Sequence, residues 1–118
     1  MKDIAASRAF YEKLGFRQIF GDQKQNWLIL QNGASTIGLF QGPQYTRNIL
    51  TFNPGWDRNG NALPEFEDVR EIQRTLASRG LSFAVLADEA STGPASFLLT
   101  DPDGNPILID QHVPKPDR

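Results

Sequence analysis

The chain contains no cysteine, and only one histidine and one methionine occur among its 118 residues. The absence of cysteine excludes disulfide bridges, a thiolate nucleophile and a zinc–thiolate site. One histidine leaves few nucleophile–base pairs for catalysis, and nothing in the sequence singles out a pair of carboxylates. No apolar run approaches the roughly 20 residues of a membrane span, and the N-terminal segment lacks the apolar stretch of a signal peptide. We therefore expect a cytoplasmic protein with no membrane partner.

Charge of one sign is not concentrated anywhere in the chain. Twelve Lys and Arg residues face 14 Asp and Glu residues, giving a net charge of −2 and a pI near 5.3. A nucleic-acid interface needs a basic patch or stripe, which these scattered residues do not form. The sequence therefore predicts no nucleic-acid partner, and its length is that of one ordinary domain.

The two halves of the sequence repeat one plan. Asp3 and Asp68 are N-cap residues, and each is followed twelve positions later by a helix-ending glycine, Gly15 or Gly80. The spacing predicts two equivalent helices. Their apolar positions match in pairs: Ile4 with Val69, Tyr11 with Leu76, and Phe16 with Leu81.

Each predicted helix has an apolar and a polar side. We expect Leu14 to join Tyr11 and Phe16 in fixing the end of the first helix to the sheet. On the second helix we expect the charged residues to be solvated; these are Arg70, Glu71, Arg74 and Arg79.

Strand-like runs follow each helix and meet in tight turns. Asn32-Gly33 is a strong hairpin signal, and residues 101–104 (Asp-Pro-Asp-Gly) form the corresponding turn of the second half. The loop over 54–67 is long enough to be a functional lid or a tolerated insertion. The predicted strands are about 16–20, 27–31, 35–41, 48–53, 83–87, 96–100 and 106–112.

The first copy lacks an opening strand, because only Met1 and Lys2 precede Asp3. A start codon placed too late, a sheet edge left open and an edge covered by another chain all remain as explanations. An open edge invites strand pairing, so we expect a homodimer in which a partner covers it.

Two segments carry a resemblance to a known family. Lys2–Phe16 (KDIAASRAFYEKLGF) and Asp101–Pro106 (DPDGNP) resemble the vicinal oxygen chelate superfamily of glyoxalases, bleomycin resistance proteins and dioxygenases. The resemblance implies an α+β fold in which two βαβββ modules form a curved half-barrel sheet around a cavity. It implies a single glyoxalase-like domain over 1–118, with module one at 1–43 and module two at 47–113. It also implies a bacterial protein and a paired or strand-exchanged dimer.

The metal ligands of this family do not carry over. The resemblance implies one ligand on each of four strands, and the first of these strands is missing. The other three positions are Gly38, Asn48 and Leu108, and none is a histidine or a carboxylate. We therefore expect no metal and no cofactor. A register slip of two or four on the last strand instead places Asp110 or His112 at the ligand position, and this alternative remains open.

Counting in steps of two from these positions outlines a cavity wall. The aliphatic alternates Ile37, Leu39, Ile49, Ile107 and Ile109 suit a helix-facing core. The predicted ligand-binding residues are Thr36, Gly38, Phe40, Asn48, Leu50, Phe52, Trp56, Leu108, Asp110 and His112. In this interpretation Gly38 widens the cavity.

Several of these residues also have ordinary structural explanations. Phe40 and Phe52 suit a core, and His112 suits a solvated C-terminal tail. Asp110 suits an edge strand. Trp27, outside the predicted set, suits a core or a dimer interface.

Three functions remain open from the sequence. The first is metal-independent binding of a small organic molecule, such as sequestration of a drug or metabolite. The second is a divalent-metal lyase, isomerase or dioxygenase of the same superfamily, with shifted ligands. The third is an interaction module whose open edge accepts a strand from another protein.

Overall fold

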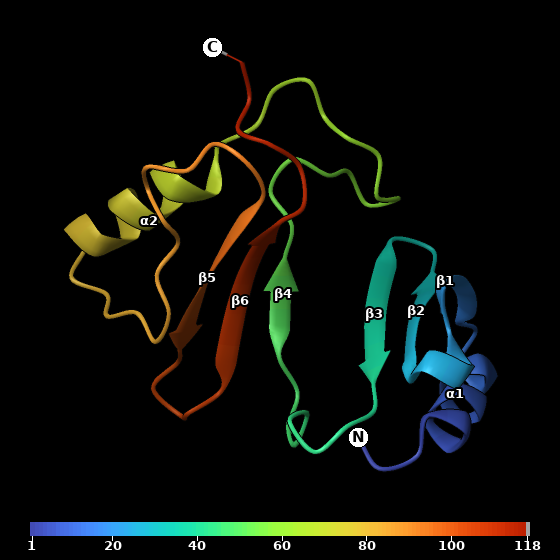
Figure 1. Cartoon of the computed structure of the whole chain (residues 1–118). Helices are drawn as coiled ribbons and strands as arrows, with labels where there is room; N and C mark the ends of the chain where they lie inside the picture. Colours follow the sequence, from blue (N-terminus) through green and yellow to red (C-terminus); the bar gives the residue numbers. More distant parts are fainter. Residues whose placement is uncertain (118) are drawn as a thin grey trace. The chain divides into compact units, whose positions relative to one another are not determined.

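The protein has a mixed α+β fold with two small sheets, described over residues 1–117 by a computed structural model (Figure 1). Its contacts divide the chain into two compact units, Met1–Arg47 and a second unit that begins at Asn48. Each unit contains one α-helix and one three-stranded sheet among the described residues. Neither helix is long and apolar enough to cross a membrane, and this holds for every helix within 1–117.

In the first unit, a helix precedes an antiparallel sheet. The sheet order is β1-β2-β3, and the turn between β2 and β3 is the predicted Asn-Gly hairpin. The tight turn pairs Leu28 with Leu39 and Leu30 with Ile37, so these four side chains share one face. The elements are α1 (Ile4–Lys13), β1 (Arg17–Asp22), the 3-10 helix η1 (Gln23–Gln25), β2 (Trp27–Asn32) and β3 (Ser35–Phe40).

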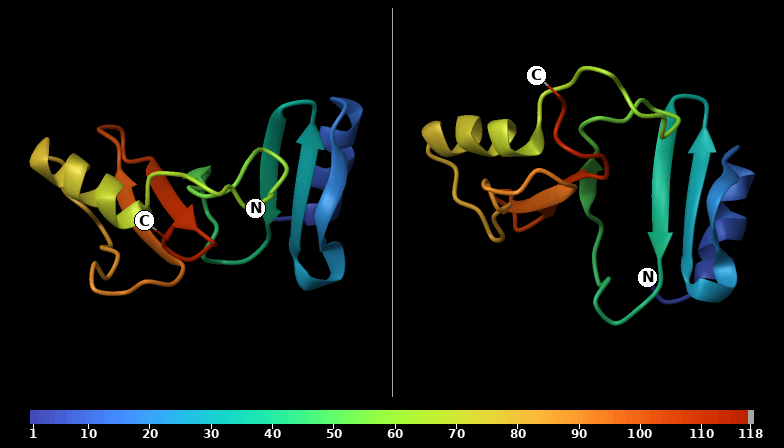
Figure 2. Two further views of the ribbon diagram at one scale, coloured as in Figure 1. Left: turned by 90° about the horizontal axis from the view of Figure 1, so that it is seen from above. Right: turned by 45° about the horizontal axis from the view of Figure 1, so that its top comes forward.

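In the second unit, a mixed three-stranded sheet is packed against a helix. The sheet order is β4-β6-β5, with β4 parallel and β5 antiparallel to the central strand β6. Helix α2 covers one face of β5 and β6 (Figure 2). The elements are β4 (Leu50–Phe52), α2 (Val69–Ser78), β5 (Ala95–Thr100) and β6 (Pro106–Gln111).

The two predicted helices are confirmed, together with their caps. The Asp3 side chain accepts a hydrogen bond from the Ala6 backbone N–H at 3.1 Å. The Asp68 side chain does the same for Arg70 at 3.0 Å. Each cap satisfies an amide that the first helical turn leaves without an intrahelical partner.

The first core forms between α1 and one face of the β1-β2-β3 sheet. Tyr11 and Phe16 pack against it from the end of the helix, as predicted. Leu14 does not, because its side chain is 56 % exposed; the prediction for this residue is wrong. Leu14 is the C-cap of the helix, and it contacts the sheet through its carbonyl, which accepts from Nδ2 of Asn32 at 3.1 Å. The buried members are Ile4, Leu28, Leu30 and Leu39, each contributing roughly 1.5–3 kcal/mol by burial.

The second core contains aliphatic and aromatic residues from α2, β5 and β6. Ile107 and Ile109 pack against it, as their position in the alternation predicted. Arg70, in contrast, is only 1 % exposed and ion-paired to Asp68 at 2.8 Å, so the prediction that it faces solvent is wrong. The buried apolar members are Val69, Ala87, Phe97 and Leu99.

The predicted strand at 83–87 does not form. Val85 makes only an isolated bridge with Leu98. The reason lies in the Gln73 side chain, which accepts from the Ala87 N–H at 2.7 Å and donates to the Ala87 carbonyl at 3.2 Å. A side-chain amide therefore takes the two backbone groups that a further strand pairing would use.

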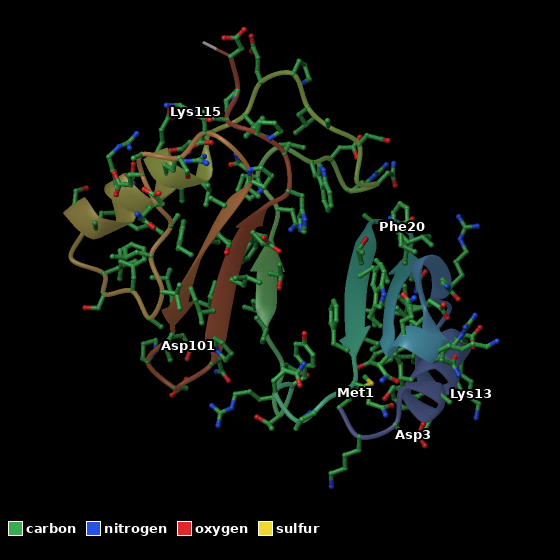
Figure 3. The ribbon with its side chains drawn as sticks, viewed as in Figure 1. Met1, Asp3, Lys13, Phe20, Asp101 and Lys115 are labelled. Atoms are coloured by element: carbon green, nitrogen blue, oxygen red, sulfur yellow. The ribbon has the colours of Figure 1, made fainter. Side chains whose placement is uncertain are left out.

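The turn between β5 and β6 forms as predicted and is labelled at Asp101 in Figure 3. The Asp101 carboxylate accepts hydrogen bonds from the backbone N–H groups of Asp103 and Asn105, at 2.9 and 2.8 Å. The side-chain and backbone hydrogen bonds from Asn105 hold the pKa of Asp101 below its ordinary value. The turn sets the antiparallel register that brings Leu108 opposite Leu98.

Candidate functional site

In the first unit, the outer face of β3 contains three predicted site residues. Thr36, Gly38 and Phe40 are exposed, while Ile37 and Leu39 pack into the core. The predicted alternation of this strand is therefore confirmed. Whether the exposed face contacts a ligand stays a prediction.

Gly38 does not widen a cavity, because the Phe40 ring lies beside it. A Cβ atom added to Gly38 would be only 2.6 Å from Cε2 of Phe40. The missing side chain thus makes room for an aromatic ring on the same strand. Trp27 pairs with Phe40 across β2 and β3 and is also partly exposed, so it does not belong to the core.

In the second unit, three predicted site residues come together. The imidazole of His112 stacks on the Trp56 indole, with centroids 4.3 Å apart and planes inclined by 6°. Nε2 of the same imidazole lies 3.1 Å from Oδ2 of Asp110. His112 therefore contacts an aromatic face and a carboxylate, and is not an isolated residue of a solvated tail. We call Trp56, Asp110 and His112 the indole–imidazole cluster.

The long loop holds Trp56 in place through its own backbone. The Trp56 N–H donates to the Asn53 carbonyl at 3.3 Å, and Trp56 forms a bridge with Ala62. Asn53 is fixed in turn, because its Nδ2 donates to the Asp110 carbonyl at 2.8 Å. Gly55, with φ +89°, is buried against Val113 and Phe66. The loop is thus packed onto the end of β6, where the cluster lies.

Asp110 lies on the central strand of its sheet, so an edge position does not explain it. Its neighbour across β5 is Ser96, and the same face of the sheet contains Leu98 and Leu108. A carboxylate on this face, away from helix α2, has an ion-pairing partner only in His112 among residues 1–117.

The register of β4 differs from the predicted one. Leu50 pairs with Ile107 and Phe52 with Ile109, so both share the face of the core positions and not that of Leu108. The prediction that Leu50 and Phe52 share a face with Leu108, made by counting in steps of two from Asn48, is therefore wrong by one residue. Leu50 and Phe52 nevertheless remain 62 % and 56 % exposed. An exposed Phe52, like an exposed Phe40, is not plain core.

A buried polar network fixes the residue that precedes His112. Oε1 of Gln111 accepts from the Val69 N–H at 2.7 Å, and its Nε2 donates to Asp68 Oδ1 at 2.8 Å and to the Val113 carbonyl at 3.1 Å. Arg70 closes the network by donating to both oxygens of Asp68. Sequence reasoning missed this network, because none of its residues falls on a predicted site position.

Electrostatics support this network. Burial by itself would raise the pKa of Asp68, but hydrogen bonds from Gln111 and Arg70, with the Arg70 charge, hold it below its ordinary value. Asp68 therefore stays ionised as the partner of Arg70. The paired charges and the N-terminus of α2 anchor the end of β6, and so anchor His112.

The donors present do not fit the metal site that the fold family implies. Gly38 and Leu108 have no donor atom, and Asn48 has only an amide. Asp110 and His112 supply two donors, but residues 1–117 contain no group of three or more histidine or acidic side chains that could hold a metal ion. Protein zinc sites commonly use three or four protein ligands.

Comparison with known proteins connects this architecture to one family. The model of the Glyoxalase/Bleomycin resistance protein/Dioxygenase superfamily matches residues 1–109. A superfamily member from Vibrio splendidus 12B01 is 17 % identical and has a TM-score of 0.60, with 94 % of this chain and 91 % of that chain covered. It supports the fold alone. No curated protein matches the chain.

Two further structures are similar at lower TM-scores. A bleomycin-binding protein complexed with bleomycin is 25 % identical, with a TM-score of 0.36 and coverage of 95 % and 92 % of the two chains. A lactoylglutathione lyase from Agrobacterium tumefaciens is 16 % identical, with a TM-score of 0.37 and coverage of 93 % and 87 %. The match of the family model to nearly the whole sequence decides the assignment: the chain belongs to the glyoxalase/bleomycin resistance protein/dioxygenase superfamily.

Proposed function

We propose that this protein binds a small organic molecule without a resident metal ion, and that it sequesters the molecule instead of converting it. The observation that carries the proposal is the indole–imidazole cluster, an accessible aromatic stack with a carboxylate beside it. Such a cluster favours a ligand with an aromatic ring and a cationic or hydrogen-bond-donating group. The ring stacks on the aromatic pair, and the polar group reaches Asp110.

The other predicted residues enter the proposal with different support. Thr36, Gly38 and Phe40 share an exposed strand face in the first unit and stay predicted contacts, separate from the cluster of the second unit. Leu108 shares the face of Asp110 and is proposed to contact the ligand beside the cluster. Asn48 stays a prediction from the sequence. Leu50 and Phe52 lie on the sheet face opposite to Leu108, so they are not proposed to contact the ligand at the cluster.

A single-tryptophan variant tests this proposal. In Trp27→Phe the only remaining indole is Trp56, which then reports on the cluster. We would titrate this variant with metal-free bleomycin and a panel of aromatic compounds, in the presence of a chelator. Bleomycin is the first probe because the family includes bleomycin resistance proteins. We expect a saturable change in emission with at least one compound.

Matched variants make the result specific to the cluster. Asp110→Asn should weaken binding at least about tenfold, the effect of losing one charged contact. Asp103→Asn, a carboxylate change in the exposed turn of the same unit, should leave affinity unchanged. Equal losses in both variants, or no saturable signal with any compound, would contradict the proposal.

The alternative is a divalent-metal lyase, isomerase or dioxygenase. One observation favours it: the side chains of Asp110 and His112 bring an oxygen and a nitrogen donor to within 3.1 Å of each other. A substrate with vicinal oxygens would have to complete the coordination. Binding of the aromatic probe that requires added metal would support this alternative over sequestration.

We also propose that the protein is a bacterial, cytoplasmic homodimer. The support for a dimer is the outer position of β1 and β3 in the first sheet, which leaves each strand with one unpaired edge among the described residues. Sedimentation of the pure protein tests the assembly, because a monomer at micromolar concentration would contradict it and would favour an edge kept for another protein.

A further inference from the structure

A depression of about 420 Å³ lies in the first unit, at the junction of η1, β2 and β3. All of its lining residues lie between Gln25 and Tyr45, so it belongs to this unit alone. It is therefore distinct from the indole–imidazole cluster of the second unit. Phe40 is the only predicted site residue that lines it.

Three aromatic residues form the apolar part of its wall. Phe40 and Tyr45 lie with ring centroids 5.4 Å apart and planes inclined by 37°. Trp27 is the cross-strand partner of Phe40, and both side chains are partly exposed. Exposed aromatic rings that line one hollow are typical of sites where the flat face of a small molecule binds.

Four amide side chains form the polar part. The amides of Gln25, Asn26 and Gln44 make no hydrogen bond within residues 1–117. Gln41 is held, because its Oε1 accepts from the Ile4 backbone N–H at 2.8 Å, and this bond leaves its two amide hydrogens available. Each primary amide both donates and accepts hydrogen bonds. The wall therefore offers paired donors and acceptors.

The backbone around the depression is fixed before any ligand binds. Asn26 has a left-handed conformation, φ 68°, that ends η1 and turns the chain into β2. Its carbonyl accepts from the Gln41 N–H at 2.9 Å, so the two amide residues are held together where β2 begins and β3 ends. A second backbone bond, from Tyr45 to Gly42 at 3.1 Å, closes the turn that contains Gln44. A preformed site loses less entropy on binding.

The lining contains no charged side chain. The polar side chains of the lining are therefore neutral donors and acceptors, and the Met1 ammonium beside them already donates to the carbonyls of Phe40 and Tyr45, at 3.1 and 2.8 Å. We propose that this depression is a binding site for the uncharged ring of a sugar, whose hydroxyl groups bond to the amides while its C–H face lies against the aromatic rings. Hydroxyls donate and accept as amides do, so the edge of the ring and the wall are complementary.

The experiment uses Trp56→Phe, in which Trp27 is the only indole and reports on the depression. We would titrate it with neutral methyl hexosides, methyl riboside and uridine. We expect a saturable change in Trp27 emission with at least one neutral glycoside, at a dissociation constant on the order of millimolar.

Two amide variants test the wall itself. Asn26→Gly keeps the left-handed backbone and removes the amide, and Gln44→Leu keeps the volume of the side chain. Each should weaken glycoside binding about tenfold or more, while Gln18→Leu, a change in an amide on β1 outside the depression, should not. Circular dichroism confirms that each variant is folded before it is titrated.

Two results would overturn the assignment. They are the absence of a saturable signal with every neutral glycoside, and binding of uridine without binding of methyl riboside. The last would mean that a nucleobase is recognised instead of a sugar. Failure here leaves the aromatic-ligand proposal untouched, because that proposal is measured through Trp56 in the Trp27→Phe variant.

Discussion

His112 lies flat against Trp56, with the two ring centroids 4.3 Å apart, although 55 intervening residues separate them in the sequence (112 − 56 − 1). The contact joins the long loop to the segment that follows β6. Since the Asp110 carboxylate pairs with the same imidazole, the His112 side chain connects the long loop to strand β6.

This stack should contribute measurably to stability. A double-mutant cycle of Trp56→Leu and His112→Leu should give a coupling free energy of about 0.5–1.5 kcal/mol, the range of stacked aromatic pairs. Urea unfolding followed by circular dichroism measures it. The control is a cycle of Trp56→Leu with Thr100→Ala, a residue at the far end of β5, and its coupling free energy should be near zero. A Trp56–His112 coupling within error of the control would show that the stack is not formed in solution.

The buried ion pair of Asp68 and Arg70 should be costly to break. Asp68→Asn leaves the guanidinium of Arg70, 1 % exposed, without its charged partner, and should lower the free energy of unfolding by roughly 3–5 kcal/mol. The matched control is Glu12→Gln in the exposed Arg8–Glu12 pair, which should cost no more than about 0.5 kcal/mol. Similar losses in the two variants would contradict the buried network.

The same aspartate predicts a dependence of stability on pH. The pKa of Asp68 is lower in the folded protein than its ordinary value of 3.8. The unfolded chain therefore binds a proton more readily, so this contribution is present above 3.8 and is lost as the pH falls below 3.8 through the folded pKa. The stability difference between wild type and Asp68→Asn should shrink between neutral and acidic pH. A constant difference measured by urea unfolding across that range would contradict the shift.

Gly55 should tolerate no side chain. It is buried at φ +89°, and an added Cβ would collide with Cγ2 of Val113. Gly55→Ala should lower the free energy of unfolding by roughly 2–4 kcal/mol, combining left-handed strain with overpacking. Gly80→Ala is the control, because Gly80 has a similar φ of +86° with nothing near its Cβ, and should cost about 1–2 kcal/mol. Equal costs would show that the loop is not packed against Val113.

The helices and turns could be predicted from the sequence because their signals are local. Asp3 and Asp68 cap the turn that directly follows them, and the residues that make the β2–β3 turn are adjacent in the chain. The alternation of β3 followed from the same kind of local pattern. These elements needed no information about distant residues.

The errors arose where a distant side chain decided the outcome. Gln73 takes the backbone groups of Ala87 and prevents a strand there. Asp68 neutralises Arg70 and allows a charged residue of α2 to be buried, contrary to the amphipathic pattern. The β4 register depended on pairing with β6, and a count from an assumed ligand position could not detect a shift of one residue.

For the candidate site, the residues could be predicted from the sequence and their contacts could not. Its residues Trp56, Asp110 and His112 were all selected from the sequence, but not the contacts that join them. The amides around the depression of the first unit were missed. Their only signal was the three amide residues Gln23, Gln25 and Asn26, with Lys24 among them, together with the pair Gln41 and Gln44, and such a run is ordinary surface in most proteins.

Calorimetric titration of the metal-stripped protein with nickel, zinc and manganese tests the central claim most directly, with metal content after purification as its control. We predict no saturable heat at micromolar protein and no bound metal, because Gly38 and Leu108 lack donor atoms and only Asp110 and His112 come together. Tight binding of one metal per chain, lost in both Asp110→Asn and His112→Leu, would contradict metal-independent binding. It would make the shifted-ligand enzyme the better account of this protein.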